Sequence, residues 1–199
     1  MPTLEYENKY EGKLVAGLDE VGRGCLAGPV VTALVILPKN VNLPEIDDSK
    51  KISKTKHKRL VEQILQQAIT VSIGLATSKE IDDIGILNAV KLAMTRSVEN
   101  ARITPDVLLI DGDKRQLLPN IALPQETIVK GDTKSISIAA ASLVAKSIRD
   151  TLMTEYAKEY PQYGWENNAG YGTESHISAI TAYGVTNQHR LTFKPIRKE

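Results

Sequence analysis

The chain has 199 residues, of which 42% are hydrophobic and 25% charged, and its formal net charge is +1. This length suits one domain, or one domain with a small addition, that buries its core without disulfides or structural metals. A net charge this small excludes a globally basic nucleic-acid-binding protein, so any basic binding surface must be local.

Neither a targeting segment nor a membrane segment is recognisable in the sequence. The N-terminus is polar and no stretch approaches the roughly 18 apolar residues of a membrane span, so we expect a cytoplasmic protein. The only cysteine, Cys25, cannot form an internal disulfide, which indicates a reducing compartment. With no histidine near it in sequence, Cys25 is interpreted as a structural thiol.

Two paired strands and a helix are predicted in the first third of the chain. Apolar runs at residues 13–18 and 30–37 flank a glycine-rich turn, which predicts strands that pair with each other. A helix is predicted over residues 55–69, with Ser53 as its N-cap. The apolar residues of its inward face are Leu60, Val61, Ile64, Leu65, Ala68 and Ile69. The β-branched run at residues 70–73 predicts a third strand.

Helices and strands are predicted to alternate through the middle of the chain. A second helix is expected over about residues 86–100. Its inward face would carry Leu87, Val90, Met94 and Val98. Four consecutive apolar residues, 107–110, are typical of a strand that is covered on both faces, as in a parallel sheet. A further short strand is expected at residues 126–129.

The last third of the sequence reads as helical. A long helix is predicted over about residues 135–159, stopped by Pro161. A short helix is predicted near Glu174–Tyr183, closed by Gly184. Together with the strands, these elements predict an α/β protein in which helices flank a mixed sheet.

Four acidic residues stand where predicted strands end: Asp19 and Glu20, then Asp111, then Asp132. Ligand sites in open α/β sheets collect at the carboxyl ends of strands. Carboxylates gathered there repel one another unless a hard cation neutralises them, and Mg²⁺ and Mn²⁺ prefer oxygen ligands. The pattern indicates a metal site for hydrolytic phosphoryl transfer. Each acid alone is also a common helix N-cap or turn residue.

Glu20 presents a geometric difficulty, because neighbouring residues in a strand point to opposite faces. On this basis Asp19 and Glu20 share a site only if the chain breaks its pleat between or after them. The glycines at positions 22 and 24 favour such a break.

Several further motifs occur in a fixed order over nearly the whole chain. They are Gly17-Leu18-Asp19-Glu20-Val21-Gly22-Arg23-Gly24, Asp48-Ser49-Lys50-Lys51-Ile52-Ser53, Leu109-Ile110-Asp111-Gly112, Lys130-Gly131-Asp132, Gly170-Tyr171-Gly172-Thr173 and His189-Arg190. In order and spacing they resemble the motifs of bacterial ribonuclease HII, a type 2 ribonuclease H family. Because separate motifs agree over most of the length, this resemblance is specific.

The resemblance implies a ribonuclease H-like catalytic domain in residues 1–160, with a small helical C-terminal extension in residues 161–199 packed on it. It implies Asp19, Glu20, Asp111 and Asp132 as the catalytic and metal-binding set, working with two Mg²⁺ or Mn²⁺ ions. The implied enzyme is a monomeric endonuclease without a membrane partner. It hydrolyses the RNA strand of RNA–DNA hybrids and cuts 5′ of single ribonucleotides in duplex DNA, leaving a 3′-hydroxyl and a 5′-phosphate.

Substrate contacts are implied for Gly22, Arg23, Gly24, Ser49, Lys50, Lys146 and Tyr171. Only the 2′-hydroxyl distinguishes a ribonucleotide from a deoxyribonucleotide, and glycines let the backbone approach it closely. The guanidinium of Arg23 can hold a phosphate, while the ring of Tyr171 can stack on the next sugar. The alternatives are ordinary turn chemistry for the glycines, a half-buried loop tyrosine for Tyr171 and a solvated helix face for the basic run that contains Lys50. For Lys146 the alternative is an aliphatic stem packed at a helix–sheet boundary.

Three residues depart from what the family usually has. Gly172 stands where proline is frequent, Ala169 where lysine is common, and Leu191 where arginine is usual. These departures bear on substrate affinity and junction preference, not on the four acids. His176 and His189 are interpreted as structural residues rather than general bases.

Two other functions compete with the nuclease. An apolar strand that ends in Asp111-Gly112-Asp113 is compatible with a phosphatase that uses Asp111 as nucleophile, although this leaves Asp19, Glu20 and Asp132 unexplained. A non-catalytic module that binds hybrids would not need clustered negative charge beside phosphates.

Overall fold

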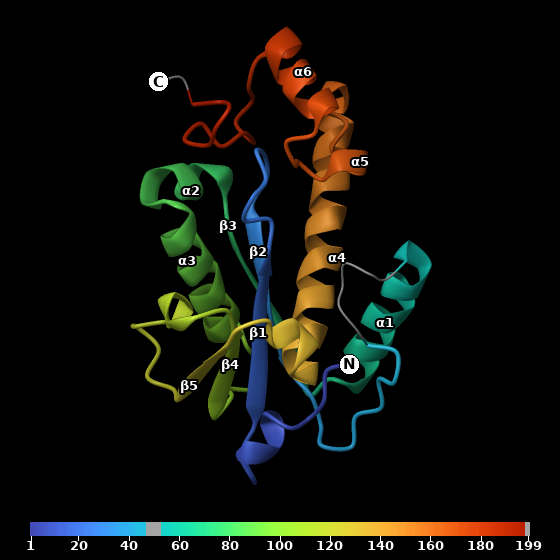
Figure 1. Cartoon of the computed structure of the whole chain (residues 1–199), viewed down its shortest axis with the longest axis vertical. Helices are drawn as coiled ribbons and strands as arrows, with labels where there is room; N and C mark the ends of the chain where they lie inside the picture. The colour runs from blue at the N-terminus through green and yellow to red at the C-terminus, as the bar shows by residue number, and fades with distance from the viewer. Residues whose placement is uncertain (47–52, 198–199) are drawn as a thin grey trace.

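The computed structural model describes residues 1–46 and 53–197, which are built around one five-stranded sheet (Figure 1). The strands are β1 (Val15–Val21), β2 (Val30–Ile36), β3 (Thr70–Ala76), β4 (Val107–Asp111) and β5 (Gln125–Ile128). They lie in the order β3-β2-β1-β4-β5. β2 is antiparallel to both β1 and β3, whereas β4 is parallel to β1 and β5. The predicted mixed sheet is confirmed.

Six α-helices lie among the described residues: α1 (Lys54–Gln67), α2 (Ser78–Ile84), α3 (Ile86–Glu99), α4 (Ile136–Glu159), α5 (Trp165–Asn168) and α6 (Glu174–Tyr183). Short 3₁₀ turns occur at η1 (Glu7–Lys9), η3 (Lys114–Gln116), η4 (Gly131–Thr133) and η5 (Pro161–Tyr163). Side-chain caps fix several helix starts. The predicted cap Ser53 accepts a hydrogen bond from the Lys56 N–H, and Ser135 accepts one from the Ile138 N–H.

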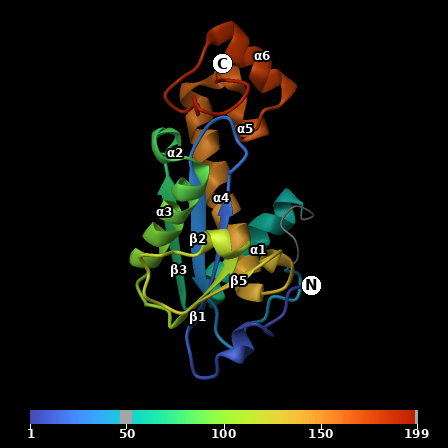
Figure 2. The same ribbon diagram turned by 60° about the vertical axis from the view of Figure 1, so that its left-hand side comes forward.

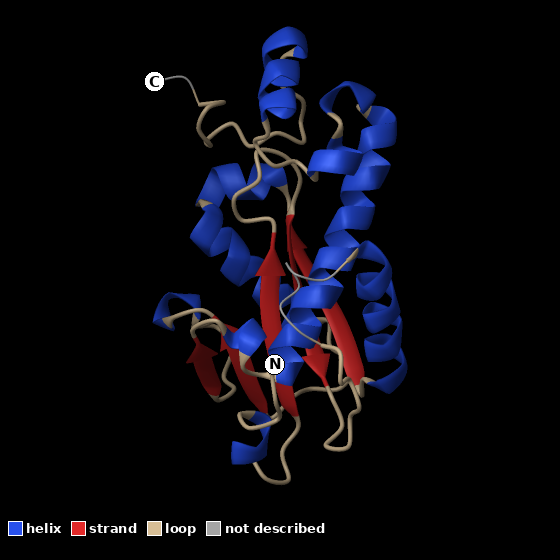
Figure 3. Cartoon of the chain, turned by 45° about the vertical axis from the view of Figure 1, so that its right-hand side comes forward, coloured by secondary structure: helices blue, strands red, loops and turns tan. Residues whose placement is uncertain are grey.

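Helices cover both faces of the sheet (Figure 3), and strand alternation divides the core into two layers, one on each face. On β2, Val30, Leu34 and Ile36 pack into the cluster that contains α2 and α3. Their neighbours Ala33 and Val35 pack into the cluster that contains α1 and α4. The same parity continues on β1 and β4, so a residue's number in these strands tells which helical layer it faces.

Helix α4 lies directly against β1 at Gly17. A Cβ atom added at Gly17 would lie 2.2 Å from the carbonyl carbon of Ser137, so the absence of a side chain allows this contact. The Glu7 carboxylate then accepts hydrogen bonds from the Ser135 hydroxyl and the Ser137 N–H, at 2.6 and 3.0 Å. These contacts fix the first turn of α4 against the sheet.

The segment after α4 gathers at one end of the molecule, where α5, α6 and the final turns lie beyond the β1–β2 connection (Figures 1 and 2). Gly184 ends α6 as predicted. The division of the chain into residues 1–160 and 161–199 stays a prediction. None of the helices in the described part of the chain is both long and apolar enough to cross a bilayer.

Details of the helices differ from the sequence-based expectations. Leu65 is 55% exposed because it follows buried Ile64 by one residue, about 100° around the helix. Ile69 is 39% exposed because α1 ends at Gln67 and the helical phase no longer applies to it. Leu87 is only partly buried. The short helices α2 and α5 were not predicted.

Candidate active site

A cavity of about 340 Å³ opens at the carboxyl ends of β1 and β4. Its lining is Asp19, Glu20, Val21, Gly22, Arg23, Gly24, Asp111, Asp132, Ser142, Lys146 and Tyr171. The structure therefore brings together all four acids and five of the seven implied substrate residues. The other two, Ser49 and Lys50, lie outside the described residues.

Strand register places Asp19 beside Asp111. The parallel pairing of Leu18 with Ile110 puts the next residue of each strand at the same level. Both acids have odd numbers, and odd-numbered residues of these strands face α4. The Ser142 hydroxyl of α4 accordingly hydrogen-bonds the Asp19 carboxylate. Asp19 is only 6% exposed, so its charge is held in a poorly solvated place.

Glu20 reaches the cavity without a break in the pleat, and the expected break is wrong. β1 continues through Glu20 and Val21, which pair with Thr32 and Val31 of β2. The parallel neighbour β4, however, ends at Asp111. Beyond that point the edge of β1 is open, so the Glu20 side chain enters the cavity from the opposite face of the sheet.

Asp132 lies in η4, which is tied to the end of β4. The Gly131 N–H donates a 2.6 Å hydrogen bond to Asp111 Oδ1. Lys130, just before it, adopts a left-handed conformation with φ 56°, which turns the chain from β5 toward α4. The third and fourth acids therefore belong to one hydrogen-bonded loop junction.

The charges of the acids are poorly compensated. Burial, followed by the charges of Glu20 and Asp111, raises the pKa of Asp19 well above its ordinary value. Burial also raises the pKa of Glu20, although the neighbouring Arg23 opposes that rise. The Glu20 Oε2 atom is buried and has no hydrogen-bond partner. A cation in the cavity would remove this electrostatic cost.

The donor set fits a hard divalent cation. Within the described part of the chain, no three His, Cys, Asp or Glu side chains already stand as a metal-ligating group. Instead, Asp19 Oδ1 accepts the Glu20 N–H at 2.7 Å, and Glu20 Oε1 accepts from Arg23 at 3.1 Å. The unpartnered Glu20 Oε2 and the carboxylate oxygens of the four acids nevertheless suit Mg²⁺ or Mn²⁺, because such ions retain water ligands and do not need a closed protein cage.

Two basic side chains border the acids. Arg23 is half exposed and pairs with Glu20, while Lys146 of α4 is partly exposed and pairs with Asp150 at 2.8 Å. Tyr171 is 47% exposed. These groups line the same cavity as the acids and have enough solvent exposure to contact a ligand.

Two polar residues near the acids were not singled out from the sequence. Ser142 lies four residues before Lys146, so the two share one face of α4. Gln116 of η3 is 3% exposed, and its Nε2 donates to Glu20 Oε1 at 3.4 Å. The helical spacing could have identified Ser142, but nothing in the sequence brings Gln116 to Glu20.

Other candidates have structural explanations. Asp113 accepts three hydrogen bonds from the Arg115 side chain, and these bonds lower the pKa of Asp113 to about 2. Asp113 lies outside the lining of the acidic cavity, which argues against an Asp-x-Asp phosphatase. Cys25 is fully buried, and burial raises the pKa of its thiol, so it is a structural thiol as predicted. His176 and His189 are buried as well.

Comparison with known proteins agrees with this geometry. Residues 16–196 match the family model of ribonuclease HII. The chain is 51% identical over 195 residues to ribonuclease HII of Pediococcus pentosaceus, covering 98% of this chain and 75% of that protein.

Solved structures share the fold. The ribonuclease H2 of Pyrococcus horikoshii superposes with a TM-score of 0.75 at 25% identity, covering 92% of this chain and 95% of the other. A structure of Bst-RNase HIII in complex with Mn²⁺ superposes with a TM-score of 0.72 at 19% identity, covering 98% of this chain and 72% of the other. Taken with the acidic cavity, these matches show that the chain belongs to the ribonuclease HII family of metal-dependent endoribonucleases, which act on RNA–DNA hybrids.

Proposed function

We propose that the acidic cavity is the catalytic centre and that Asp19, Glu20, Asp111 and Asp132 hold two divalent ions, Mg²⁺ or Mn²⁺. The observation that carries this proposal is the single cavity shared by the four acids, the 22–24 turn and Tyr171. Asp19 is deeply buried and lies within the charge fields of both Glu20 and Asp111, so its carboxylate would gain most from a bound divalent ion. The Mn²⁺ complex of the structurally similar Bst-RNase HIII supports the choice of ion.

The proposed reaction is hydrolysis of a phosphodiester. The oxygen of a water molecule attacks phosphorus, the bond from phosphorus to the 3′-oxygen breaks, and the products are a 3′-hydroxyl and a 5′-phosphate. Bound divalent ions would supply an activated water and would stabilise the leaving oxygen. The chain's own carboxylates fix where the positive charge stands. Arg23 and Lys146 lie beside them to hold the phosphates of the substrate strand.

We further propose that the enzyme cuts 5′ of single ribonucleotides embedded in duplex DNA. The recognition turn, defined as residues 22–24, presents backbone at the cavity. A Cβ atom at Gly24 would meet nothing within 4 Å, so a sugar can approach the backbone there. The exposed ring of Tyr171 faces the same cavity and would stack on the sugar that follows.

Several expectations accompany this proposal and stay predictions. Ser49 and Lys50 would contact the substrate strand, together with Lys146. The protein would act as a monomer in the cytoplasm. Gly172, Ala169 and Leu191 would adjust substrate affinity or junction preference without affecting the four acids.

The direct test is cleavage of an end-labelled DNA duplex that contains one ribonucleotide. We expect a single cut on its 5′ side with Mg²⁺ or Mn²⁺ and none with chelator. Cleavage of a long RNA–DNA hybrid without this cut would retain the nuclease and remove the junction role of the recognition turn and Tyr171. Absence of both cleavages would contradict the assignment of the cavity as the catalytic centre.

Gly24→Ala isolates the recognition turn from the fold. Because the added methyl group enters open space, the free energy of unfolding should change by less than about 0.5 kcal/mol. Cleavage at the embedded ribonucleotide should nevertheless fall about 10-fold or more, because the methyl group occupies the path of the sugar. Equal cleavage rates for the variant and the wild type would argue against close approach at Gly24.

A further inference from the structure

The buried side chain of Arg190 binds the backbone of the recognition turn. Its guanidinium donates to the carbonyl of Gly22 at 2.7 Å and to the carbonyl of Arg23 at 2.9 Å. It also donates to the Gly28 carbonyl through Nε and Nη2, at 3.0 and 2.8 Å. The Arg190 side chain therefore binds two consecutive peptide groups of the turn and anchors them to the start of β2.

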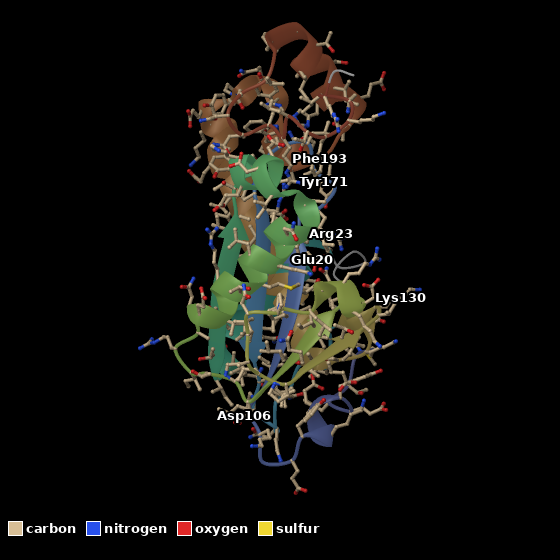
Figure 4. The ribbon with its side chains drawn as sticks, turned by 90° about the vertical axis from the view of Figure 1, so that its left-hand side faces the viewer. Glu20, Arg23, Asp106, Lys130, Tyr171 and Phe193 are labelled. Atoms are coloured by element: carbon tan, nitrogen blue, oxygen red, sulfur yellow. The ribbon has the colours of Figure 1, made fainter. Side chains whose placement is uncertain are left out.

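A second buried side chain holds Tyr171. His176 Nδ1 lies 2.9 Å from the Tyr171 carbonyl, and His176 Nε2 accepts a 3.0 Å hydrogen bond from the Trp165 indole N–H. His176 Nε2 also lies 3.2 Å from His189 Nε2. His189 immediately precedes Arg190, so one continuous set of contacts joins Tyr171 to the recognition turn. Tyr171 and Arg23 of that turn are labelled in Figure 4.

The tautomers in this set are fixed by their neighbours. An indole N–H can only donate, so His176 Nε2 is an acceptor and its proton is on Nδ1, where it donates to the Tyr171 carbonyl. His189 Nδ1 accepts the Thr186 N–H at 2.9 Å, so its proton is on Nε2 and points to His176. Both rings must be neutral, and burial lowers the pKa of each, in agreement with this arrangement.

Neither Arg190 nor His176 can touch the substrate, because both side chains are 0% exposed. Their only route to the reaction is through the backbone of the residues that they hold. Arg190 makes no ion pair within the described residues, and the hydrogen bonds that its guanidinium makes there all go to backbone carbonyls. A buried guanidinium whose hydrogen bonds all go to backbone carbonyls holds those carbonyls in position.

We propose that Arg190 and His176, linked through His189, are positioning residues that set the spacing between the recognition turn and Tyr171. In doing so they determine how strongly the enzyme prefers a ribonucleotide–DNA junction over continuous RNA. This inference rests on the proposed junction role of the turn and Tyr171. The segment after α4 is then part of the specificity of the enzyme, although it contributes none of the four acids.

The test compares two substrates: a DNA duplex with one ribonucleotide and a long RNA–DNA hybrid. Arg190→Lys keeps the charge but cannot bind two peptide groups with a planar fork. We expect the ratio of junction cleavage to hybrid cleavage to fall about 10-fold, since displacements near 1 Å can cost about 100-fold in rate. Loss of folded protein lowers both rates equally and leaves this ratio unchanged.

A pair of variants at His176 tests the second contact and also serves if Arg190→Lys does not fold. His176→Asn keeps an N–H donor in reach of the Tyr171 carbonyl, whereas His176→Leu does not. Both remove the acceptor for Trp165, so they are matched in that loss. The ratio should fall for the Leu variant and be largely restored in the Asn variant.

Leu60→Ala is the control for instability, because Leu60 is buried in the α1–α4 layer and lies outside the lining of the acidic cavity. It should lower the stability of the fold and leave the ratio unchanged. An unchanged ratio in folded Arg190→Lys, or equal ratios for the two His176 variants, would overturn the positioning role. If the wild-type enzyme cuts the RNA–DNA hybrid but not the duplex with one ribonucleotide, the proposed cleavage at single ribonucleotides is wrong, and this inference is wrong with it.

Discussion

Two groups of buried charges lie close together in this molecule, and the fold compensates them to different degrees. Asp19 and Glu20 line a cavity in which burial raises both pKa values and Glu20 Oε2 has no partner. Arg149 and Arg190 are each 0% exposed. Arg149 donates to the carbonyls of Pro29, Ala27 and Ala169, and Arg190 donates to carbonyls of the recognition turn.

The acidic cavity is suited to catalysis, whereas the loops held by Arg149 and Arg190 are suited to positioning the substrate. These buried arginines direct their N–H groups at backbone carbonyls and stay charged at neutral pH, although burial lowers the pKa of Arg190 to about 10. Buried carboxylates that repel one another are stable only with added positive charge. We infer that the folded chain carries its recognition elements ready-made, whereas its acidic centre is completed by the divalent ions.

Removal of one acid should have the largest effect on activity. Asp132→Asn should reduce cleavage of an RNA–DNA hybrid by at least about 100-fold, since a direct ligand should matter at least as much as an outer contact. The free energy of unfolding should change by less than about 1 kcal/mol, because the residue is only partly buried.

Asp113→Asn provides the matched control, because this neighbouring aspartate is paired with Arg115 outside the acidic cavity. Its cleavage rate should remain within about 3-fold of the wild type. Full activity in Asp132→Asn would remove that residue from the site.

Acidification should lower the stability of the segment around His176, His189 and Arg190. Burial, and then the adjacent His176, lowers the pKa of His189 to about 4. In the unfolded chain His189 binds a proton below about pH 6.5, whereas in the folded state it stays neutral until the pH approaches about 4. Stability contributed by neutral His189 is therefore present above about pH 6.5, is lost as the pH falls toward 4, and reaches at most about 3 kcal/mol.

Urea unfolding at pH 7 and pH 4 measures this effect. His189→Asn keeps an acceptor for the Thr186 N–H but does not titrate. The wild type should lose more stability than this variant between the two pH values. Parallel losses would show that His189 is not the group responsible.

An exposed ion pair should matter least. The Arg96 side chain holds the pKa of Glu80 at about 2, but the two side chains are 37% and 30% exposed, so solvent screens their attraction. Glu80→Gln should cost no more than about 1 kcal/mol at neutral pH in urea unfolding. Because this pKa is lowered, the pair's contribution should fade as the pH drops from about 4.5 toward 2. A larger loss of stability in Glu80→Gln at neutral pH would show that an exposed ion pair can matter as much as the buried charges of the acidic cavity and of the two arginines.

Much of the fold followed from local pattern. The unbroken apolar run before Asp111 predicted a doubly covered strand, and Ser53, Pro161 and Gly184 predicted helix ends that the structure confirms. Helix α2 was missed because it is short and only Ser78 and Ile81 are buried in it, so it has little hydrophobic periodicity.

The site was predictable where it depended on strand ends and was not where it depended on distant contacts. Asp19 and Asp111 stand at the ends of apolar runs, which the sequence displays directly. The route by which Glu20 enters the cavity depends on β4 ending at the level of Asp19, two residues before β1 ends at Val21. The grip of Arg190 on Gly22 joins residues 168 positions apart, and no local pattern encodes such a contact.

The most direct test of the central contrast is thermal unfolding of the wild type and Asp19→Asn, each in chelator and in Mn²⁺. Saturating Mn²⁺, at about 100 times its dissociation constant, should raise the wild-type Tm by about 5–10 °C. Asp19→Asn should melt above the wild type in chelator, because a repelling buried charge is gone, and should respond little to Mn²⁺. The account would be contradicted if Mn²⁺ did not change the wild-type Tm and if Asp19→Asn melted below the wild type in chelator.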